Sequence, residues 1–294
     1  MKCPHCNQEH PDGFQFCPTT GQKINVFKAC TNSSCPENGK YTLPIDSMYC
    51  PVCGSKLDSF DKGQNGDERV FNVNGVSFKM IKVESGTFDM GDYKSSLCPI
   101  HSITLSHDYF VGETPVTQAL WLAVMGNNPS SFKGTQNPVE NVNWNYCEEF
   151  IKNLNHKTNC KFRLPTEAEW EFAARGGTNS NGYEFSGSNN IQEVAWYNGN
   201  SGSKTHPVKQ KKPNELGIYD MSGNVWELCN DWLNHNYYTE SPNIDPKGPS
   251  SGSYRVTRGG SWDYGAGLCC VWWRSNCSPD SMGSDLGFRL ALSE

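Results

Sequence analysis

The sequence lacks long hydrophobic runs and any excess of positive charge. Only 36% of its 294 residues are hydrophobic, and no apolar stretch approaches the roughly 20 residues that cross a bilayer. The N-terminal hexapeptide MKCPHC has no apolar segment after its lysine, so we expect neither a secretory signal nor a membrane span. The 25 basic residues are outnumbered by 31 acidic ones, and this net charge of −6 argues against nucleic-acid binding.

Sustained helical patterns are also scarce. The chain contains 28 Gly and 17 Pro, and stretches rich in these residues and in Asn interrupt most periodic segments. Such a composition argues against a helical bundle and favours an α+β fold with short elements and many loops.

Cysteine, by contrast, is abundant and unevenly placed, with seven of the 14 residues in the first 53 positions. Two close pairs stand 14 residues apart, Cys30 with Cys35 and Cys50 with Cys53. Paired thiolates at this spacing are typical of zinc ribbons, in which each turn presents two ligands to one tetrahedral Zn²⁺. We therefore predict a structural zinc site at these four residues.

Residues 3–20, which precede this site, form a similar zinc-ribbon pattern in which one ligand is replaced. Cys3, Cys6 and Cys17 are in place, but Thr20 stands where the fourth cysteine is expected. We expect His10 to be the replacement ligand, with His5 as second choice; the alternative is that this unit has lost its metal. Paired zinc thiolates favour a reducing, cytoplasmic compartment.

Residues 1–57 are thus interpreted as a tandem zinc-ribbon module. Residues 1–60 contain five Lys and five acidic residues, so the module has no charge excess for binding phosphate. Protein docking, or stabilisation of the N-terminus, is the better expectation for its role.

The polar segment 58–69 reads as a linker, and residues 70–294 as one domain. An Asn74–Gly75 turn followed by alternating Val76, Phe78 and Met80 predicts a β-hairpin, and a similar alternation predicts a strand near 103–105. Three helices have start signals: Thr117 before a helix to 125, Asn143 before an amphipathic segment, and a Thr166–Glu169 capping box.

Seven motifs follow one another along this domain: GTFDMG (86–91), ETPVT (113–117), PVENVNW (138–144), RLPTEAEWEFAAR (163–175), GIYDMSGNVWE (217–227), RGGSW (258–262) and GFR (287–289). In this order they resemble the motifs of the formylglycine-generating enzyme (sulfatase-modifying factor) family. The resemblance covers the whole domain and implies a C-type-lectin-like fold of α+β class. It does not by itself imply catalysis, because function depends on the site rather than the fold.

Enzymes of this family oxidise a sulfatase cysteine with two active-site cysteines that bind copper(I). The resemblance places these cysteines at Tyr264 and Cys269, so only the second is present; Cys270 and Cys277 are out of register. One thiolate cannot form a two-thiolate copper site, and we interpret Cys269 as a core residue. The alternative is an oxidase, or a related enzyme, that uses Cys269.

The resemblance also implies a calcium site. Its ligands would be the carboxylates of Asp220 and Glu227 and the carbonyls of Gly223 and Val225, hard oxygens of the kind that Ca²⁺ prefers. The alternative is that the two acids only brace the turn between them.

The segment 263–285 resembles, block by block, the variable region of diversity-generating retroelement proteins. In those proteins a template with Asn codons is mutated at adenines, and the residues that can result include Asp, Tyr, Gly, Leu, Ser, Asn and Cys but not Trp or Met. Most positions of the segment agree; Trp273 does not, and Trp272 and Met282 need other adenine-containing codons. The predicted variable positions are Asp263, Tyr264, Gly265, Gly267, Leu268, Trp272, Trp273, Ser275, Asn276, Cys277, Ser278, Ser281, Met282, Gly283, Ser284 and Asp285.

This pattern predicts a non-catalytic display protein that binds a protein or another ligand through 263–285. The amino-acid composition of this segment is similar to that of antibody loops, and Tyr264, Trp272 and Trp273 would be its rigid aromatic anchors. The alternative for the two tryptophans is a place in the core. A further hypothesis is a structural adaptor, in which the zinc ribbons dock a partner and the large domain is only a scaffold.

Overall fold

The computed structural model describes residues 27–29, 42–44, 61–62, 66–93 and 98–293. The chain divides into two compact units, Met1–Phe60 and Asp61–Glu294. In the first unit the described residues form one antiparallel pair of strands, β1 (Phe27–Ala29) and β2 (Thr42–Pro44). The predicted zinc ligands Cys3, Cys6, His10, Cys17, Cys30, Cys35, Cys50 and Cys53 lie outside the described residues, so the zinc sites stay predictions.

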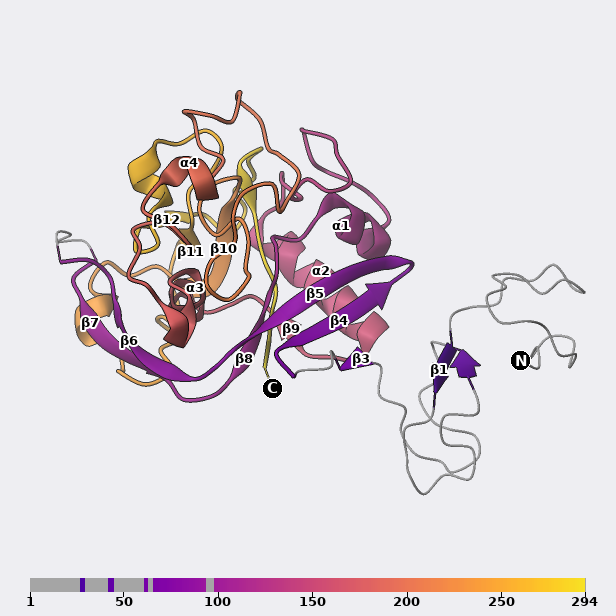
Figure 1. The fold of residues 1–294 in the computed structure, drawn as a ribbon, viewed down its shortest axis with the longest axis horizontal. Coiled ribbons are helices and arrows are strands. Elements are labelled where there is room, and N and C mark those ends of the chain that lie inside the picture. The colour runs from indigo at the N-terminus through magenta and orange to yellow at the C-terminus, as the bar shows by residue number, and fades with distance from the viewer. Residues whose placement is uncertain (1–26, 30–41, 45–60, 63–65, 94–97, 294) are drawn as a thin grey trace, which may run out of the picture. The chain divides into compact units, whose positions relative to one another are not determined.

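The larger unit contains a six-stranded antiparallel sheet (Figure 1). Its strands, in spatial order, are β3 (Asp61–Lys62), β4 (Glu68–Val73), β5 (Val76–Val83), β8 (Tyr109–Gly112), β14 (Ala291–Ser293) and β9 (Phe162–Arg163). The predicted hairpin is present in β4 and β5, and both turn residues, Asn74 and Gly75, have the positive φ of a tight hairpin turn. The C-terminal strand pairs with β8, which joins the two ends of the domain.

The domain begins earlier than the sequence suggests. Four residues of the predicted linker 58–69 belong to the sheet, because β3 pairs with the start of β4 through Asp61–Val70 and Lys62–Arg69. Hydrophobic patterning does not reveal these residues because an edge strand is exposed and is commonly polar.

A second, four-stranded sheet positions the C-terminal third of the chain. In spatial order it consists of β12 (Arg274–Cys277), β11 (Arg255–Arg258), β10 (Trp226–Trp232) and β13 (Leu286–Gly287). A separate hairpin pairs β6 (Gly86–Met90) with β7 (His101–Leu105), and the latter is the strand predicted from the alternation at 103–105.

The three predicted helices form with the predicted caps. They are α1 (Gln118–Met125) with N-cap Thr117, α2 (Trp144–Thr158) with N-cap Asn143, and α3 (Glu167–Ala174), which begins with the complete Thr166–Glu169 capping box. Shorter elements are α4 (Ile191–Val194), α5 (Tyr237–Glu240) and the 3₁₀ turns η1 (Gly177–Asn179) and η2 (Ala266–Cys269). Helix α3 packs between the β6–β7 hairpin and the four-stranded sheet (Figure 1).

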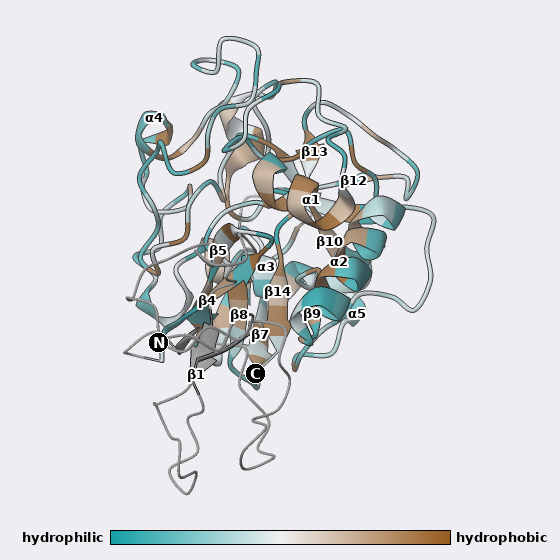
Figure 2. Ribbon diagram, turned by 90° about the vertical axis from the view of Figure 1, so that its right-hand side faces the viewer, coloured by the Kyte–Doolittle hydropathy of each residue, from teal (hydrophilic) through white to brown (hydrophobic). Residues whose placement is uncertain are grey.

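The core combines large apolar side chains with buried ion pairs. Figure 2 shows hydrophilic residues along much of α2 and hydrophobic ones along β8 and β14. Trp170 of α3 is fully buried, and its Nε1 donates to the Glu227 carboxylate at 2.6 Å. The same carboxylate accepts hydrogen bonds from Arg289 Nε and Nη2, each at 2.6 Å. In the part of the chain that is described, no helix is long and apolar enough to cross a membrane.

Candidate functional site

The segment 263–285 lies on the surface of the four-stranded sheet and contains η2 and β12. All sixteen predicted variable positions are exposed or half-buried. The residues Cys269, Cys270 and Val271, which lie among them in sequence, are buried at 0%, 1% and 1% exposure. The segment therefore alternates between positions that face solvent and positions that fill the core.

The rest of the domain holds this segment mainly by its main chain. Backbone N–H groups of Asn198, Asn141 and Trp226 donate to the carbonyls of Tyr264, Gly283 and Asp285 at 3.1, 2.9 and 2.7 Å. The Trp262 indole donates to the Ser284 carbonyl at 3.0 Å, and the Arg258 guanidinium to the Trp273 carbonyl. Strand β12 adds four residue pairs with β11. Since every residue has a carbonyl, these bonds are available whatever side chain occupies the position.

Two residues outside the predicted variable set supply side-chain anchors. The buried Arg274 guanidinium binds the Glu167 carboxylate of α3 through two hydrogen bonds of 2.8 and 2.5 Å. It also lies 4.4 Å above the Tyr238 ring. The Asp280 carboxylate accepts from the Asn145 amide at 2.9 Å. Both anchors thus occupy positions that the sequence pattern leaves constant.

The aromatic residues of the segment differ in depth. Tyr264 is 40% exposed, and its ring lies edge-on to Trp226 with 5.5 Å between centroids. Trp272 and Trp273 are half-buried, with Trp272 against the main core and both against a smaller cluster that includes Phe185. Met282 is 56% exposed. The two tryptophans are therefore partly core and partly surface, between the two alternatives drawn from the sequence.

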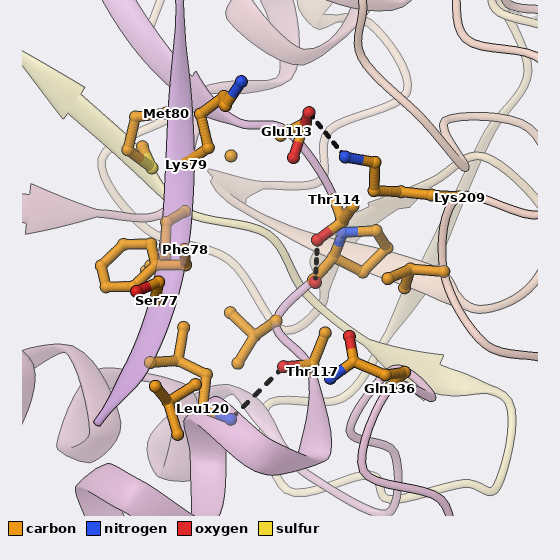
Figure 3. Close-up of a pocket in the computed structure, with 16 residues that line it drawn as sticks. Ser77, Phe78, Lys79, Met80, Glu113, Thr114, Thr117, Leu120, Gln136 and Lys209 are labelled. Atoms are coloured by element: carbon orange, nitrogen blue, oxygen red, sulfur yellow. Dashed lines mark hydrogen bonds and ion pairs between the residues drawn. The ribbon is translucent and has the colours of Figure 1, made fainter. Parts of the chain in front are cut away.

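A pocket of about 230 Å³ lies elsewhere in the domain, between β5 and the segment that leads into α1 (Figure 3). Its charged groups pair with one another or with neighbours: Lys209 with Glu113 at 2.9 Å, and Lys79 with Glu68 at 2.7 Å. Thr117 at its lower end accepts from the first turn of α1. Because these polar groups already have partners, the pocket is a weaker candidate than segment 263–285.

Comparison with known proteins gives the family. Residues 71–294 match the sulfatase-modifying factor enzyme 1-like domain. The chain belongs to this family.

Two proteins with different names are similar in sequence to this chain. It is 36% identical over 269 residues to the chaperone protein LppX of Paenibacillus barcinonensis, covering 74% of this chain and 91% of that protein. It is 39% identical over 169 residues to the formylglycine-generating enzyme of Streptomyces coelicolor, which is 52% of each chain.

Among solved structures, Treponema denticola variable protein 1 matches with a TM-score of 0.73 and 40% identity. The match covers 77% of this chain and 99% of that one. PvdO from Pseudomonas aeruginosa matches with a TM-score of 0.65 and 25% identity, over 76% of this chain and 98% of that one. The predicted α+β fold of C-type-lectin-like type is thereby confirmed.

The two positions that the resemblance assigns to active-site cysteines, Tyr264 and Cys269, are occupied by an exposed tyrosine and a buried thiol. Burial raises the pKa of Cys269 to about 12, so this thiol is protonated at neutral pH. A side chain at Gly260 would place its Cβ 2.6 Å from Cys269 Sγ, so the neighbouring backbone encloses the sulfur closely. Burial also raises the pKa of Cys270 and brings that of Cys277 to about 11. The nucleophilic, copper-binding form of a cysteine is the thiolate, and none of these positions favours it.

Of the two carboxylates that the resemblance implies for calcium, Glu227 already has a partner, and the calcium site itself stays a prediction. Both carboxylate oxygens of Glu227 bind the Arg289 guanidinium, and the residue is fully buried. Asp220 accepts from the Lys209 backbone N–H at 2.9 Å, and burial raises its pKa to about 6. Glu227 thus acts as the partner of Arg289, which favours the bracing alternative for this residue.

Sequence reasoning missed the buried charges that support the site. Glu171 of α3 binds Arg258 of β11 and Arg175, and all three residues lie within the quoted motifs. Nothing in the local pattern marks such residues as buried, because charged side chains are ordinarily exposed.

Proposed function

We propose that this chain is a non-catalytic ligand-binding protein and that segment 263–285 is its recognition surface. The observation that carries the proposal is the combination of exposed side chains with a backbone held by carbonyl hydrogen bonds. Such an arrangement permits the side chains to change without loss of the fold. The similarity to Treponema denticola variable protein 1 supports the same conclusion.

The chemistry of the two cysteine positions supports a binding role over an oxidase role. The first position is Tyr264, and the second, Cys269, holds its proton at neutral pH. A redox site with one buried thiol has neither the second soft ligand nor the thiolate that copper(I) needs. The family membership keeps the oxidase as the competing hypothesis.

The display proposal is tested on the coding DNA. We expect sequences of codons 258–290 from many cells to differ at the sixteen positions, and a near-copy of the region to lie nearby. The differences should trace to adenines in that copy. A uniform segment with no copy would remove the diversification part of the proposal.

We also infer that residues 1–57 bind zinc through the two predicted ligand sets and add a docking surface for a protein. This part rests on cysteine spacing alone. Its test is separate, since metal content can be measured independently of any ligand of the larger domain. Deletion of 1–57 without loss of a known partner would argue against the adaptor hypothesis.

A further inference from the structure

A tight turn lies beside the proposed recognition surface. The Asn200 N–H donates to the Tyr197 carbonyl at 2.9 Å and closes this turn. Its two central residues are Asn198 and Gly199, and both are exposed. The Asn198 N–H donates to the Tyr264 carbonyl at 3.1 Å, so the turn is one of the backbone anchors of the surface.

Packing requires glycine at the second central position of the turn. A Cβ atom at Gly199 would lie 2.5 Å from Cε2 of the Tyr197 ring, far inside van der Waals contact. The ring is held in place, because it packs against the cluster that includes Phe185 and its hydroxyl accepts from Gln192 Nε2 at 2.5 Å. Position 199 therefore needs glycine for a steric reason, and the turn contains an Asn–Gly pair.

An Asn–Gly pair has a specific chemical reactivity. The backbone nitrogen of the glycine attacks the side-chain carbonyl carbon of the asparagine; an N–C bond forms, and ammonia leaves with the proton of that nitrogen. Water then opens the resulting succinimide ring at either carbonyl, which gives aspartate or isoaspartate. Glycine favours the attack because it has no side chain to hinder it. Water is the only co-reactant, but the attacking nitrogen and the amide must be free to meet.

Three Asn–Gly pairs lie wholly within the described ranges, at 74–75, 181–182 and 198–199. In the first pair both reacting groups are engaged. The Gly75 N–H donates to the Asn72 side chain at 3.1 Å, and the Asn74 amide donates to the Ala123 carbonyl at 2.7 Å. These bonds hold the nitrogen and the amide of the hairpin turn away from each other, which should slow the reaction.

The other two pairs differ in their hydrogen bonds. In the pair Asn181–Gly182 the attacking nitrogen is engaged, because the Gly182 N–H donates to Ser180 Oγ at 3.2 Å. Within the part of the chain that the structure describes, neither the Asn198 side chain nor the Gly199 N–H has a hydrogen-bond partner. The pair at 198–199 is therefore the one that reaches the reactive geometry with least disruption.

We propose that Asn198 is a site of spontaneous deamidation in the folded protein, with aspartate and isoaspartate as its products. The inference concerns the reactivity of the turn and does not depend on the proposed function. Its consequence bears on that function, because the reaction places a negative charge at the edge of segment 263–285. Isoaspartate also adds a methylene group to the backbone beside the hydrogen bond to Tyr264. Ageing would thus alter the recognition surface at a position outside the variable set.

The test is incubation of the folded full chain in neutral buffer, sampled over several weeks and analysed by peptide mapping with mass spectrometry. Conversion of the amide to an acid raises the mass of the peptide, and electron-transfer fragmentation distinguishes isoaspartate from aspartate. The matched variant is Asn198→Gln, which keeps an amide but would need a larger ring to react. A second sample is the wild-type chain unfolded in urea, where no tertiary contact restrains any pair.

We expect Asn198 in the folded chain to react about tenfold faster than Asn181, because a hydrogen bond at Gly182 must first break there. Asn74, with two engaged groups, should react more slowly still. In urea the three asparagines should react at similar rates, since each is followed by glycine. The Asn198→Gln variant should show no conversion at this position and unchanged rates at the other two.

Two results would overturn the inference. Equal rates at Asn198 and Asn181 in the folded chain would mean that hydrogen bonding does not select the site. Reaction at Asn198 in urea but not in the folded chain would mean that the turn protects the residue. Either result leaves the display function standing, because that function is tested on the coding DNA; a uniform coding segment would in turn leave the deamidation site standing.

Discussion

Replacement of Arg274 by alanine is the most direct test of how segment 263–285 is anchored to the rest of the domain. The side chain is 6% exposed and is bound to Glu167 by two hydrogen bonds. Without it, Glu167 keeps only a weaker contact with Arg258 Nε at 3.5 Å and a hydrogen bond of 3.3 Å from the Tyr238 hydroxyl.

Breaking a buried ion pair from one side costs about 3 to 5 kcal/mol, because the remaining charge stays buried. Arg258 still lies next to Glu167, so we expect a value near the lower end, about 3 kcal/mol. For a domain of this size each kcal/mol lowers the melting temperature by about 2 to 4 °C, which gives a loss of roughly 6 to 12 °C.

The assay is thermal or urea unfolding of the full chain and of four variants. The matched controls are Ser275→Ala and Asn276→Ala, the next two residues of the same strand, which are half-buried and exposed, respectively. Each should change the free energy of unfolding by less than about 0.5 kcal/mol. The double variant Arg274→Met/Glu167→Gln should recover part of the loss, because no charge then remains without its partner.

The reasoning is refuted if Arg274→Ala destabilises the protein no more than Asn276→Ala. The segment would then be held by its carbonyl hydrogen bonds alone, and Arg274 would be as replaceable as its neighbours.

Three further outcomes are expected. Burial, with the neighbouring Glu167 carboxylate, raises the pKa of Asp231 to about 8, so between about pH 4 and 8 the folded state holds a proton that the unfolded state releases. Stability should therefore fall as pH rises through this window, and Asp231→Asn should flatten the slope in unfolding measured at several pH values. A cysteine-containing sulfatase peptide with copper(I) and O₂ should gain no formylglycine by mass spectrometry, and Cys269→Ser should not alter the result; turnover lost in that variant would restore the oxidase hypothesis. Elemental analysis should find two zinc ions per chain, falling to one in Cys50→Ser; a single zinc in the wild-type chain would mean that the unit with Thr20 has lost its metal.

Local signals in the sequence predicted the local structure well. Each of the three helices begins at a residue whose side chain caps the first turn, Thr117, Asn143 and Thr166, and each cap involves atoms only a few residues apart. The Asn74–Gly75 turn determined the hairpin for the same reason. These features need no distant partner, so each can be predicted from the residues of its own segment.

Strands β10 to β13 had no such signal. The burial pattern of β10 does not alternate cleanly, since its first four residues are all buried. The strand lies between β11 and β13 and packs against α3, so it does not show the simple alternation of a half-exposed strand. Its partners Arg258 and Leu286 are remote in the chain, and only folding brings them together.

Some features of the candidate site follow from the sequence, and others follow only from the tertiary structure. The sequence by itself determined the family, the loss of the first cysteine at Tyr264 and the block pattern of 263–285, because these are matters of residue order. Only the tertiary structure decided that Arg274 faces inward and that Glu227 is committed to Arg289. Burial and charge pairing depend on which distant segments meet, and that is the property of a chain that its local pattern does not encode.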